Sequence, residues 1–114
     1  MTTQPTRIRN HTTLLGQTMA LLAIQTEHPE LADLGSVEWQ VSTLGLLSCY
    51  VQAEDGEAVA DAYQQVLGGV VEEPLPFARK DEPMEVRYLD TVWRDARVQI
   101  RVASPAPARL AVAS

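Results

Sequence analysis

Most residues of this chain whose types could perform chemistry have a spacing that indicates a structural role. Cys49, the single cysteine, falls in an alternating apolar run, so we expect it to point into the core as a small hydrophobic side chain. A nucleophilic cysteine needs a neighbouring base and partial exposure, and the sequence around Cys49 offers no base. We therefore expect no catalytic residue in this chain.

The two histidines lie at opposite ends of one predicted helix. By the rise per residue His11 and His28 are about 25 Å apart, so they cannot share a metal ion through that helix. His28 stands beside Pro29 at the end of the helix, where an imidazolium interacts favourably with the helix dipole. The chain also lacks the CxxC, HExxH and Cys/His patterns of zinc sites. We expect neither a metal ion nor a cofactor.

The acidic residues and the paired glycines have spacings that favour structural roles. The four acids between residues 54 and 61 surround the predicted start of a helix, where negative charge is stabilising. Asp90 stands in the middle of a predicted strand beside arginines of the next strand, which favours a cross-strand ion pair over a general base. Gly68-Gly69 follow a helix instead of preceding one, so their amides form no phosphate cradle.

Composition indicates one domain and excludes several classes of partner. The chain has 114 residues, 46% of them hydrophobic and 21% charged, which is typical of a single globular domain. Its net charge of -6 disfavours binding to nucleic acid phosphates. The most apolar stretch, residues 14–24, is about half as long as a membrane span. We expect a cytoplasmic protein that contacts no membrane.

The chain is expected to begin with a leader and a helix. Residues 1–10 are polar and aperiodic, which predicts a flexible leader. Thr12 or Thr13 can cap a helix that ends before Pro29, and a connector follows with Leu31 and Leu34 under the core. The apolar positions of this helix are expected at Leu14, Leu15, Met19, Leu22 and Ala23.

Two alternating runs and a second helix follow. Residues 36–43 and 47–53 alternate between apolar and polar side chains, which predicts an antiparallel hairpin with a turn near Leu44-Gly45. Asp55 then caps a helix that ends at Gly68-Gly69. The apolar stripe of this helix consists of Val59, Ala62, Tyr63, Val66 and Leu67.

The last third of the chain combines an irregular segment with a clear hairpin. Residues 70–84 contain three prolines among acids, so we expect a lid, an edge strand at residues 70–73 or a mobile loop. Residues 85–93 and 97–103 predict a hairpin that turns at Arg94-Asp95, with Leu89 opposite Ile100. Residues 104–114 form a Pro/Ala tail that we expect to be disordered.

These elements predict an α+β fold within residues 11–103. The order is helix, strand, strand, helix, optional edge strand, strand, strand. We expect an antiparallel sheet of four strands, or five with the edge strand, and two helices packed on its apolar face. The opposite face of the sheet stays open.

The open sheet face is the strongest candidate for an interaction site. Its expected members are Tyr50, Tyr88, Arg97 and Arg101, which alternation places on one side of the sheet. Tyrosine and arginine are enriched at protein interfaces. Ordinary solvated strand residues, with a cation-π contact between Tyr88 and Arg101, remain an equally simple interpretation.

A second candidate site is a pocket between the helices and the sheet. Its lining would include Trp39, Cys49, Tyr63 and Trp93, with residues 70–84 as a lid. Core packing is the simpler role for both tryptophans.

Two segments carry a resemblance to known proteins. The ending Ala-x-Ala-Tyr-x-x-Val-Leu-Gly-Gly at residues 60–69 and the run Val-Trp-Arg-Asp-Ala-Arg-Val at residues 92–98 resemble small α+β proteins of unassigned function from actinobacterial genomes and their mobile elements. The resemblance implies a bacterial or phage accessory protein and carries over no catalytic residue.

Three functions follow from these observations. The first is a non-enzymatic domain that binds a protein partner and forms a homodimer through a sheet edge or the open sheet face. The second is a small-ligand-binding domain or modest enzyme that uses the pocket. The third is an acidic mimic of nucleic acid, although the acids form no long stripe.

Overall fold

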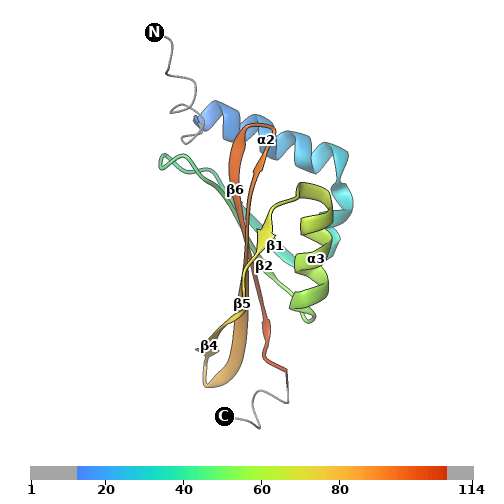
Figure 1. Cartoon of the computed structure of the whole chain (residues 1–114), viewed down its shortest axis with the longest axis vertical. Helices are drawn as coiled ribbons and strands as arrows, with labels where there is room; N and C mark the ends of the chain where they lie inside the picture. The colour runs from blue at the N-terminus through green and yellow to red at the C-terminus, as the bar shows by residue number, and fades with distance from the viewer. Residues whose placement is uncertain (1–12, 108–114) are drawn as a thin grey trace.

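The computed structural model describes residues 13–107 and shows two α-helices on one side of a six-stranded sheet (Figure 1). A long hairpin of β5 and β6 runs through the length of the molecule, and α2 and α3 lie beside it. The elements are α2 (Leu14–Glu27), the 3-10 helix η1 (Pro29–Asp33), β1 (Ser36–Gln40), β2 (Leu47–Gln52), α3 (Gly56–Leu67), β3 (Val70–Val71), β4 (Leu75–Arg79), β5 (Glu82–Trp93) and β6 (Ala96–Pro105).

The sheet is mixed. Its strands follow the order β1-β2-β6-β5-β3, and β4 pairs with the first residues of β5. The α+β class is confirmed, but the expectation of a wholly antiparallel sheet of four or five strands is wrong, because β2 and β6 run parallel and β4 adds a strand. The chain returns to β2 only after α3 and three further strands, and a connection of that length can bring in a parallel strand.

The core lies between the helices and the inner face of the sheet. Alternate residues of β2 and β6 point into it, as the period of two predicted. The sheet contributes Leu47, Cys49, Val51, Leu89, Val98, Ile100 and Val102, and the helices contribute Ala20, Ile24, Leu31, Val59, Ala60, Tyr63 and Leu67. Trp39 and Trp93 are half-buried and pack against this cluster.

The start and the end of α3 lie where the sequence predicts them. The Asp55 side chain accepts a hydrogen bond from the amide of Ala58 and caps the helix. Gly68 and Gly69 both have positive φ angles, 77° and 95°, which end the helix at little steric cost. The predicted stripe is buried at Val59, Tyr63 and Leu67.

The helix α2 has the predicted ends but buries a different side. Thr13 caps it and it stops before Pro29, as expected. The expected inward positions were wrong: Leu14, Leu15, Met19 and Leu22 are exposed, whereas Gln17, Ala20 and Ile24 are buried. The Gln17 amide donates to the carbonyl of Ser42 and accepts from its N–H, at 2.8 Å each, so a specific pair of hydrogen bonds holds this side inward.

Both predicted hairpins are present. β1 pairs with β2 in antiparallel fashion, and β5 pairs with β6 with Leu89 opposite Ile100. Arg94 and Asp95 both have positive φ angles, the backbone pattern of a type I′ turn, which suits the twist of a hairpin.

Residues 70–84 form strands instead of a lid or a mobile loop. Val70 and Val71 make the predicted edge strand, and β4 turns at Lys80-Asp81 into β5. Pro76 is compatible with β4 because that strand lies at the edge of the sheet, where a missing N–H costs little. The strand β6 also continues through Ser104 to Pro105, two residues into the expected tail.

The core face carries one charged pair that the sequence did not predict. Arg87 Nη1 lies 3.1 Å from Glu85 Oε2, and both side chains are largely buried. Ser104 pairs with Glu85 and is buried beside it. A Cβ at Gly56 would approach the Ser104 hydroxyl to 2.2 Å, so the start of α3 packs directly on this polar cluster. The predicted leader 1–10 and residues 108–114 of the tail lie outside the described residues.

Candidate functional site

The sheet face opposite the helices gathers aromatic and arginine side chains at its centre. Arg101 of β6 pairs with Tyr50 of β2 on one side and with Tyr88 of β5 on the other. Directly paired residues of neighbouring strands point to the same face, so the three side chains form a row across three strands. The Arg101 guanidinium carbon lies 5.9 Å from the centroid of the Tyr50 ring, within the range of a cation-π contact.

Arg97, the fourth member of the predicted patch, lies outside this row. It is four residues from Arg101 on β6, about 13 Å along a strand, and it pairs with Val92 near the β5–β6 turn. Between the two arginines, Asp90 accepts a hydrogen bond from the Gln99 amide at 3.0 Å. An amide is therefore one cross-strand partner of Asp90, where the sequence led us to expect an arginine.

The β4–β5 hairpin adds an arginine that the sequence did not single out. Arg79 Nη2 donates to the Tyr50 hydroxyl at 2.6 Å, and Nη1 donates to Gln52 Oε1 at 2.8 Å. These bonds join β4 to β2 across the sheet face. A turn at Lys80-Asp81 between alternating apolar residues could have revealed this hairpin, but the three prolines of the segment obscured the alternation.

A hollow of about 320 Å³ adjoins the row of side chains. Its lining consists of Glu38, Gln40, Ser48, Tyr50 and Arg101. The Arg101 Nε atom is buried and has no hydrogen-bond partner within residues 13–107. A buried donor without a partner is costly, so an oxygen acceptor that reached this atom would lower the free energy of the site.

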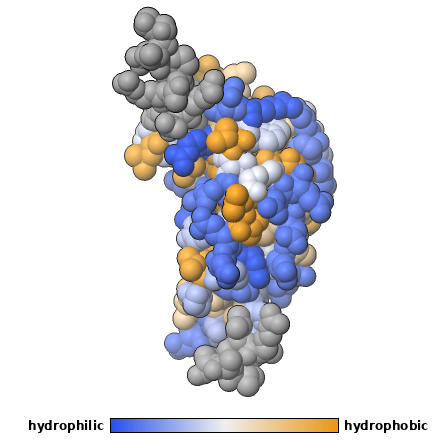
Figure 2. Space-filling model, viewed as in Figure 1, coloured by the Kyte–Doolittle hydropathy of each residue, from blue (hydrophilic) through white to orange (hydrophobic). Residues whose placement is uncertain are grey.

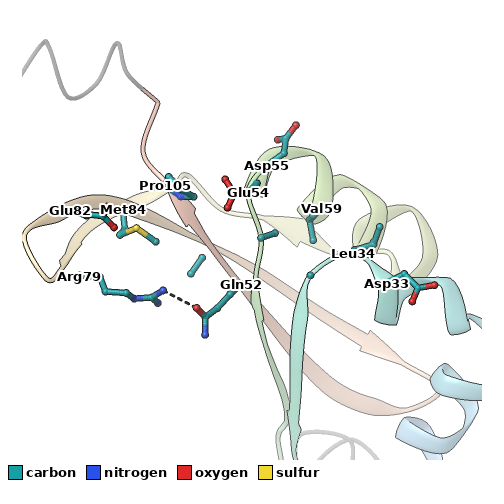
Figure 3. Close-up of a pocket in the computed structure, with 13 residues that line it drawn as sticks. Asp33, Leu34, Gln52, Glu54, Asp55, Val59, Arg79, Glu82, Met84 and Pro105 are labelled. Atoms are coloured by element: carbon teal, nitrogen blue, oxygen red, sulfur yellow. Dashed lines mark hydrogen bonds between the residues drawn. The ribbon is translucent and has the colours of Figure 1, made fainter.

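A larger open cavity of about 680 Å³ lies where the β4–β5 hairpin faces the start of α3 (Figure 3). The Arg79–Gln52 hydrogen bond crosses one side of it, and Glu54 and Asp55 lie on the other. Its acids are Asp33, Glu54, Asp55 and Glu82. The cavity is wide open, whereas a small-molecule pocket encloses most of the surface of its ligand.

Cys49 and Tyr63 meet inside the core. Burial raises the pKa of the Cys49 thiol from its ordinary 9.0 to about 12, which keeps the thiol protonated. Burial also raises the pKa of Tyr63, and the neighbouring Cys49 adds to that rise. The Tyr63 hydroxyl donates to the carbonyl of Leu31 at 3.3 Å. The position and protonation of Cys49 argue against a nucleophile.

The four residues of the predicted pocket do not line one cavity. A cavity of about 280 Å³ between α2, η1, β1 and α3 includes Trp39 and Tyr63 in its lining, together with His28. Cys49 is fully buried and Trp93 lies outside the lining. No residue of 70–84 borders this cavity, so that segment does not act as its lid.

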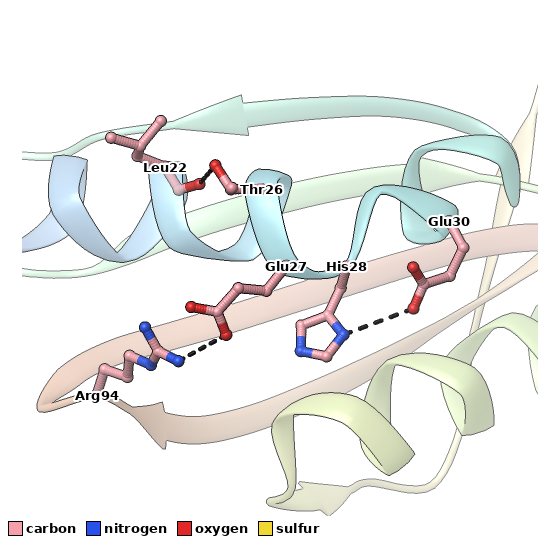
Figure 4. A network of polar contacts seen from close by, with 6 residues as sticks. All are labelled: Leu22, Thr26, Glu27, His28, Glu30 and Arg94. Carbon is pink, nitrogen blue, oxygen red and sulfur yellow. Dashed lines mark hydrogen bonds and ion pairs between the residues drawn. The ribbon is translucent and has the colours of Figure 1, made fainter.

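His28 belongs to a contact network at the end of α2 (Figure 4). Its Nδ1 atom lies 3.5 Å from Glu30 Oε2, and its ring meets the edge of Trp93 at 6.4 Å between centroids. Arg94 bonds to Glu27 at 2.6 Å and stacks over Trp93 at 4.6 Å. The network ties α2 to the β5–β6 turn, which is a structural role.

No protein-family model, no curated protein and no solved structure matches this chain. Within residues 13–107, no three His, Cys, Asp or Glu side chains are grouped so that they could hold a metal ion. The helices in the same range are too short to cross a bilayer.

Proposed function

We propose that this chain is a non-enzymatic, self-associating accessory domain of a bacterium or phage that binds a segment of a partner protein. The binding site is the row of Tyr50, Arg101 and Tyr88 on the sheet face opposite the helices, with Arg79 beside it.

The observation that carries this proposal is the buried, unpartnered Nε of Arg101. A charged group without a full set of partners costs free energy in the free protein, and a carbonyl or carboxylate oxygen of a bound segment would recover it. The adjoining hollow of about 320 Å³ provides room for such a group.

The surroundings of Arg101 support the same interpretation. The Tyr50 hydroxyl is held by Arg79, and the Tyr50 ring lies against Arg101, so the aromatic surface is fixed before a partner arrives. Fixed side chains lose less conformational entropy on binding. Tyrosine and arginine are also the residues that most often dominate protein interfaces.

The charge distribution favours a partner segment that carries a carboxylate. Two arginines, Arg79 and Arg101, contact Tyr50, and Glu38 is the one acid among the residues that line the adjoining hollow. A bidentate arginine–carboxylate pair is among the stronger polar contacts in proteins.

The test is capture of a partner followed by binding of the purified pair. The tagged full chain is used to isolate proteins from extracts of its source organism, and the dissociation constant of the recovered partner is then measured by calorimetry. We expect the Arg97→Ser/Arg101→Ser variant to bind at least tenfold more weakly, with Arg101→Ser accounting for most of the loss.

Arg94→Ser is the matched control, because it also removes an arginine but lies at the β5–β6 turn beside Glu27. It should bind like the unaltered chain. Unchanged affinity in the Arg101→Ser variant would reject this sheet face as the binding site.

A small-ligand-binding domain is the second candidate, favoured by the cavity that Trp39 and Tyr63 line. A bound metabolite should raise the melting temperature by several degrees at saturating concentration. The Trp39→Ala variant should lose that shift. A metabolite panel without any shift would remove this candidate.

A further inference from the structure

The helix α2 presents an apolar stripe to solvent. Leu15, Met19 and Leu22 follow the spacing i, i+4, i+7 and are 69%, 62% and 64% exposed, and Leu14 precedes them. Apolar surface lies over α2 at the upper margin of Figure 2. A helix whose apolar residues are not confined to its buried face is typical of one that is covered on more than one side.

Two threonines extend this stripe without adding free polar groups. Thr18 Oγ1 donates to the carbonyl of Leu14 at 2.8 Å, and Thr26 Oγ1 donates to the carbonyl of Leu22 at 2.7 Å. Both hydroxyls bond within the helix, so the threonines add little demand for water. No residue from Leu14 to Thr26 is charged.

The absence of charge favours a second copy of this chain as the occupant. Two molecules of net charge -6 repel each other over most orientations. The α2 stripe is a surface on which two copies can meet without bringing like charges together. It would give a charged partner no means of recognition.

The stripe is also self-complementary. In a two-fold symmetric dimer the same surface appears on both sides, and each contact occurs twice. An antiparallel pair of α2 helices would place Leu15 against Leu22 of the second copy and the two Met19 side chains near the axis.

We propose that two copies of this chain associate through the exposed face of α2, as an antiparallel pair of helices. The proposal deepens the self-association included in the proposed function and rests on it. The dimer contact then lies on α2 and not on the expected sheet edge or open sheet face. The row of Tyr50, Arg101 and Tyr88 therefore remains available to a partner in the dimer.

The size of the stripe indicates a dimer of modest affinity. The helix is about 21 Å long and 10 Å wide, whereas a stable dimer buries about 800 Å² per partner. Leu44, 86% exposed on the loop that Gln17 anchors, can add to the contact. We therefore expect a dissociation constant in the micromolar range.

The test is the mass of the full chain by light scattering and sedimentation between 1 and about 200 µM, a range that spans dissociation constants expected for such weak interfaces. The unaltered chain should shift from monomer to dimer across this range. The Leu15→Ser/Leu22→Ser variant should remain a monomer. Val70→Ser is the matched control, because Val70 is equally exposed, at 65%, but lies at the far edge of the sheet. It should dimerise like the unaltered chain.

Complementary charges test the antiparallel geometry. The Leu15→Lys and Leu22→Glu variants should each be monomeric, because each places an unpaired charge against a leucine. Mixed together, they should form a heterodimer, since Lys at one position meets Glu at the other. Absence of this rescue would overturn the antiparallel arrangement.

The outcomes separate this inference from the proposed function. A monomeric unaltered chain at the highest concentration, or a dimer that survives Leu15→Ser/Leu22→Ser, overturns the α2 interface whatever the partner assay shows. If the unaltered chain is monomeric and the Leu15→Ser/Leu22→Ser variant loses partner capture, the stripe binds another protein. That result would also overturn the α2 dimer interface. If Arg101→Ser retains partner binding, the proposed binding site fails while the dimer can still stand.

Discussion

The helices α2 and α3 pack on the same sheet face, but different forces orient them. α3 is apolar along one stripe, and it buries that stripe at Val59, Tyr63 and Leu67. α2 has apolar residues on every side, and it buries Gln17 while three leucines remain outside. Burial of apolar area suffices to orient an amphipathic helix. For a helix without a polar side, a few specific contacts decide, here the two Gln17–Ser42 bonds.

The largest effect should come from the stripe of α3. Tyr63 is fully buried, so Tyr63→Ala should lower the free energy of unfolding by about 3 to 5 kcal/mol, through lost burial and the cavity left behind. Urea denaturation measures this change. Tyr63→Phe keeps the ring and removes the hydroxyl with its hydrogen bond to the Leu31 carbonyl, so it should cost about 1 kcal/mol. A loss below about 1 kcal/mol for Tyr63→Ala would contradict the dominance of apolar burial in α3.

The orientation of α2 depends on one amide. Gln17→Ala leaves the Ser42 N–H without its partner and removes one of two hydrogen bonds to the Ser42 carbonyl, the other coming from the Gly45 N–H. We expect a loss of about 1 to 3 kcal/mol in the free energy of unfolding. Gln25→Ala on the exposed side should stay within about 0.5 kcal/mol of the unaltered chain. Equal effects of the two substitutions in urea denaturation would mean that Gln17 does not orient the helix.

Titration of the thiol packed against α3 tests how deeply that side of the core is buried. The thiol of Cys49, which lies beside Tyr63 of α3, has its pKa raised from 9.0 to about 12 by burial. Between these values the unfolded chain loses the proton and the folded chain keeps it. The free energy of unfolding therefore keeps its full value below pH 9 as far as this thiol is concerned. It declines as pH rises towards 12, by about 1 kcal/mol at pH 10.

Melting temperatures between pH 8 and 11 measure this decline. In Cys49→Ala the decline should be smaller by that amount, whatever the substitution does to stability at neutral pH. Parallel pH profiles for the two chains would show that the thiol does not titrate as its burial requires.

The hairpins and helix ends could be predicted because each depends on neighbouring residues. Alternation and the Arg94-Asp95 turn fix the register that places Leu89 opposite Ile100, since a shift by one residue would turn every side chain to the other face. Asp55 and Thr13 identify the helix starts in the same local way. Prolines hid the alternation around Lys80-Asp81, and the β4 strand was missed for that reason.

The candidate site could be predicted only in part. Alternation places Tyr50, Tyr88 and Arg101 on the open face, but their common row depends on the parallel pairing of β2 with β6. That pairing joins a strand that precedes α3 in the sequence to one that follows it, and no local sequence pattern predicts it. The contact of Arg79 with Tyr50 depends on the same arrangement.

The sequence by itself determined the local structure of this protein: the caps, the turns, the two hairpins and the buried stripe of α3. These features arise from interactions within a few residues, and each leaves a pattern in the chain. The tertiary structure alone decided that β6 lies beside β2, that Gln17 faces inward and that Arg79 reaches Tyr50. Each depends on contacts between residues far apart in the chain, such as Gln17 with Ser42, where shape and hydrogen bonding choose among alternatives of similar hydrophobicity.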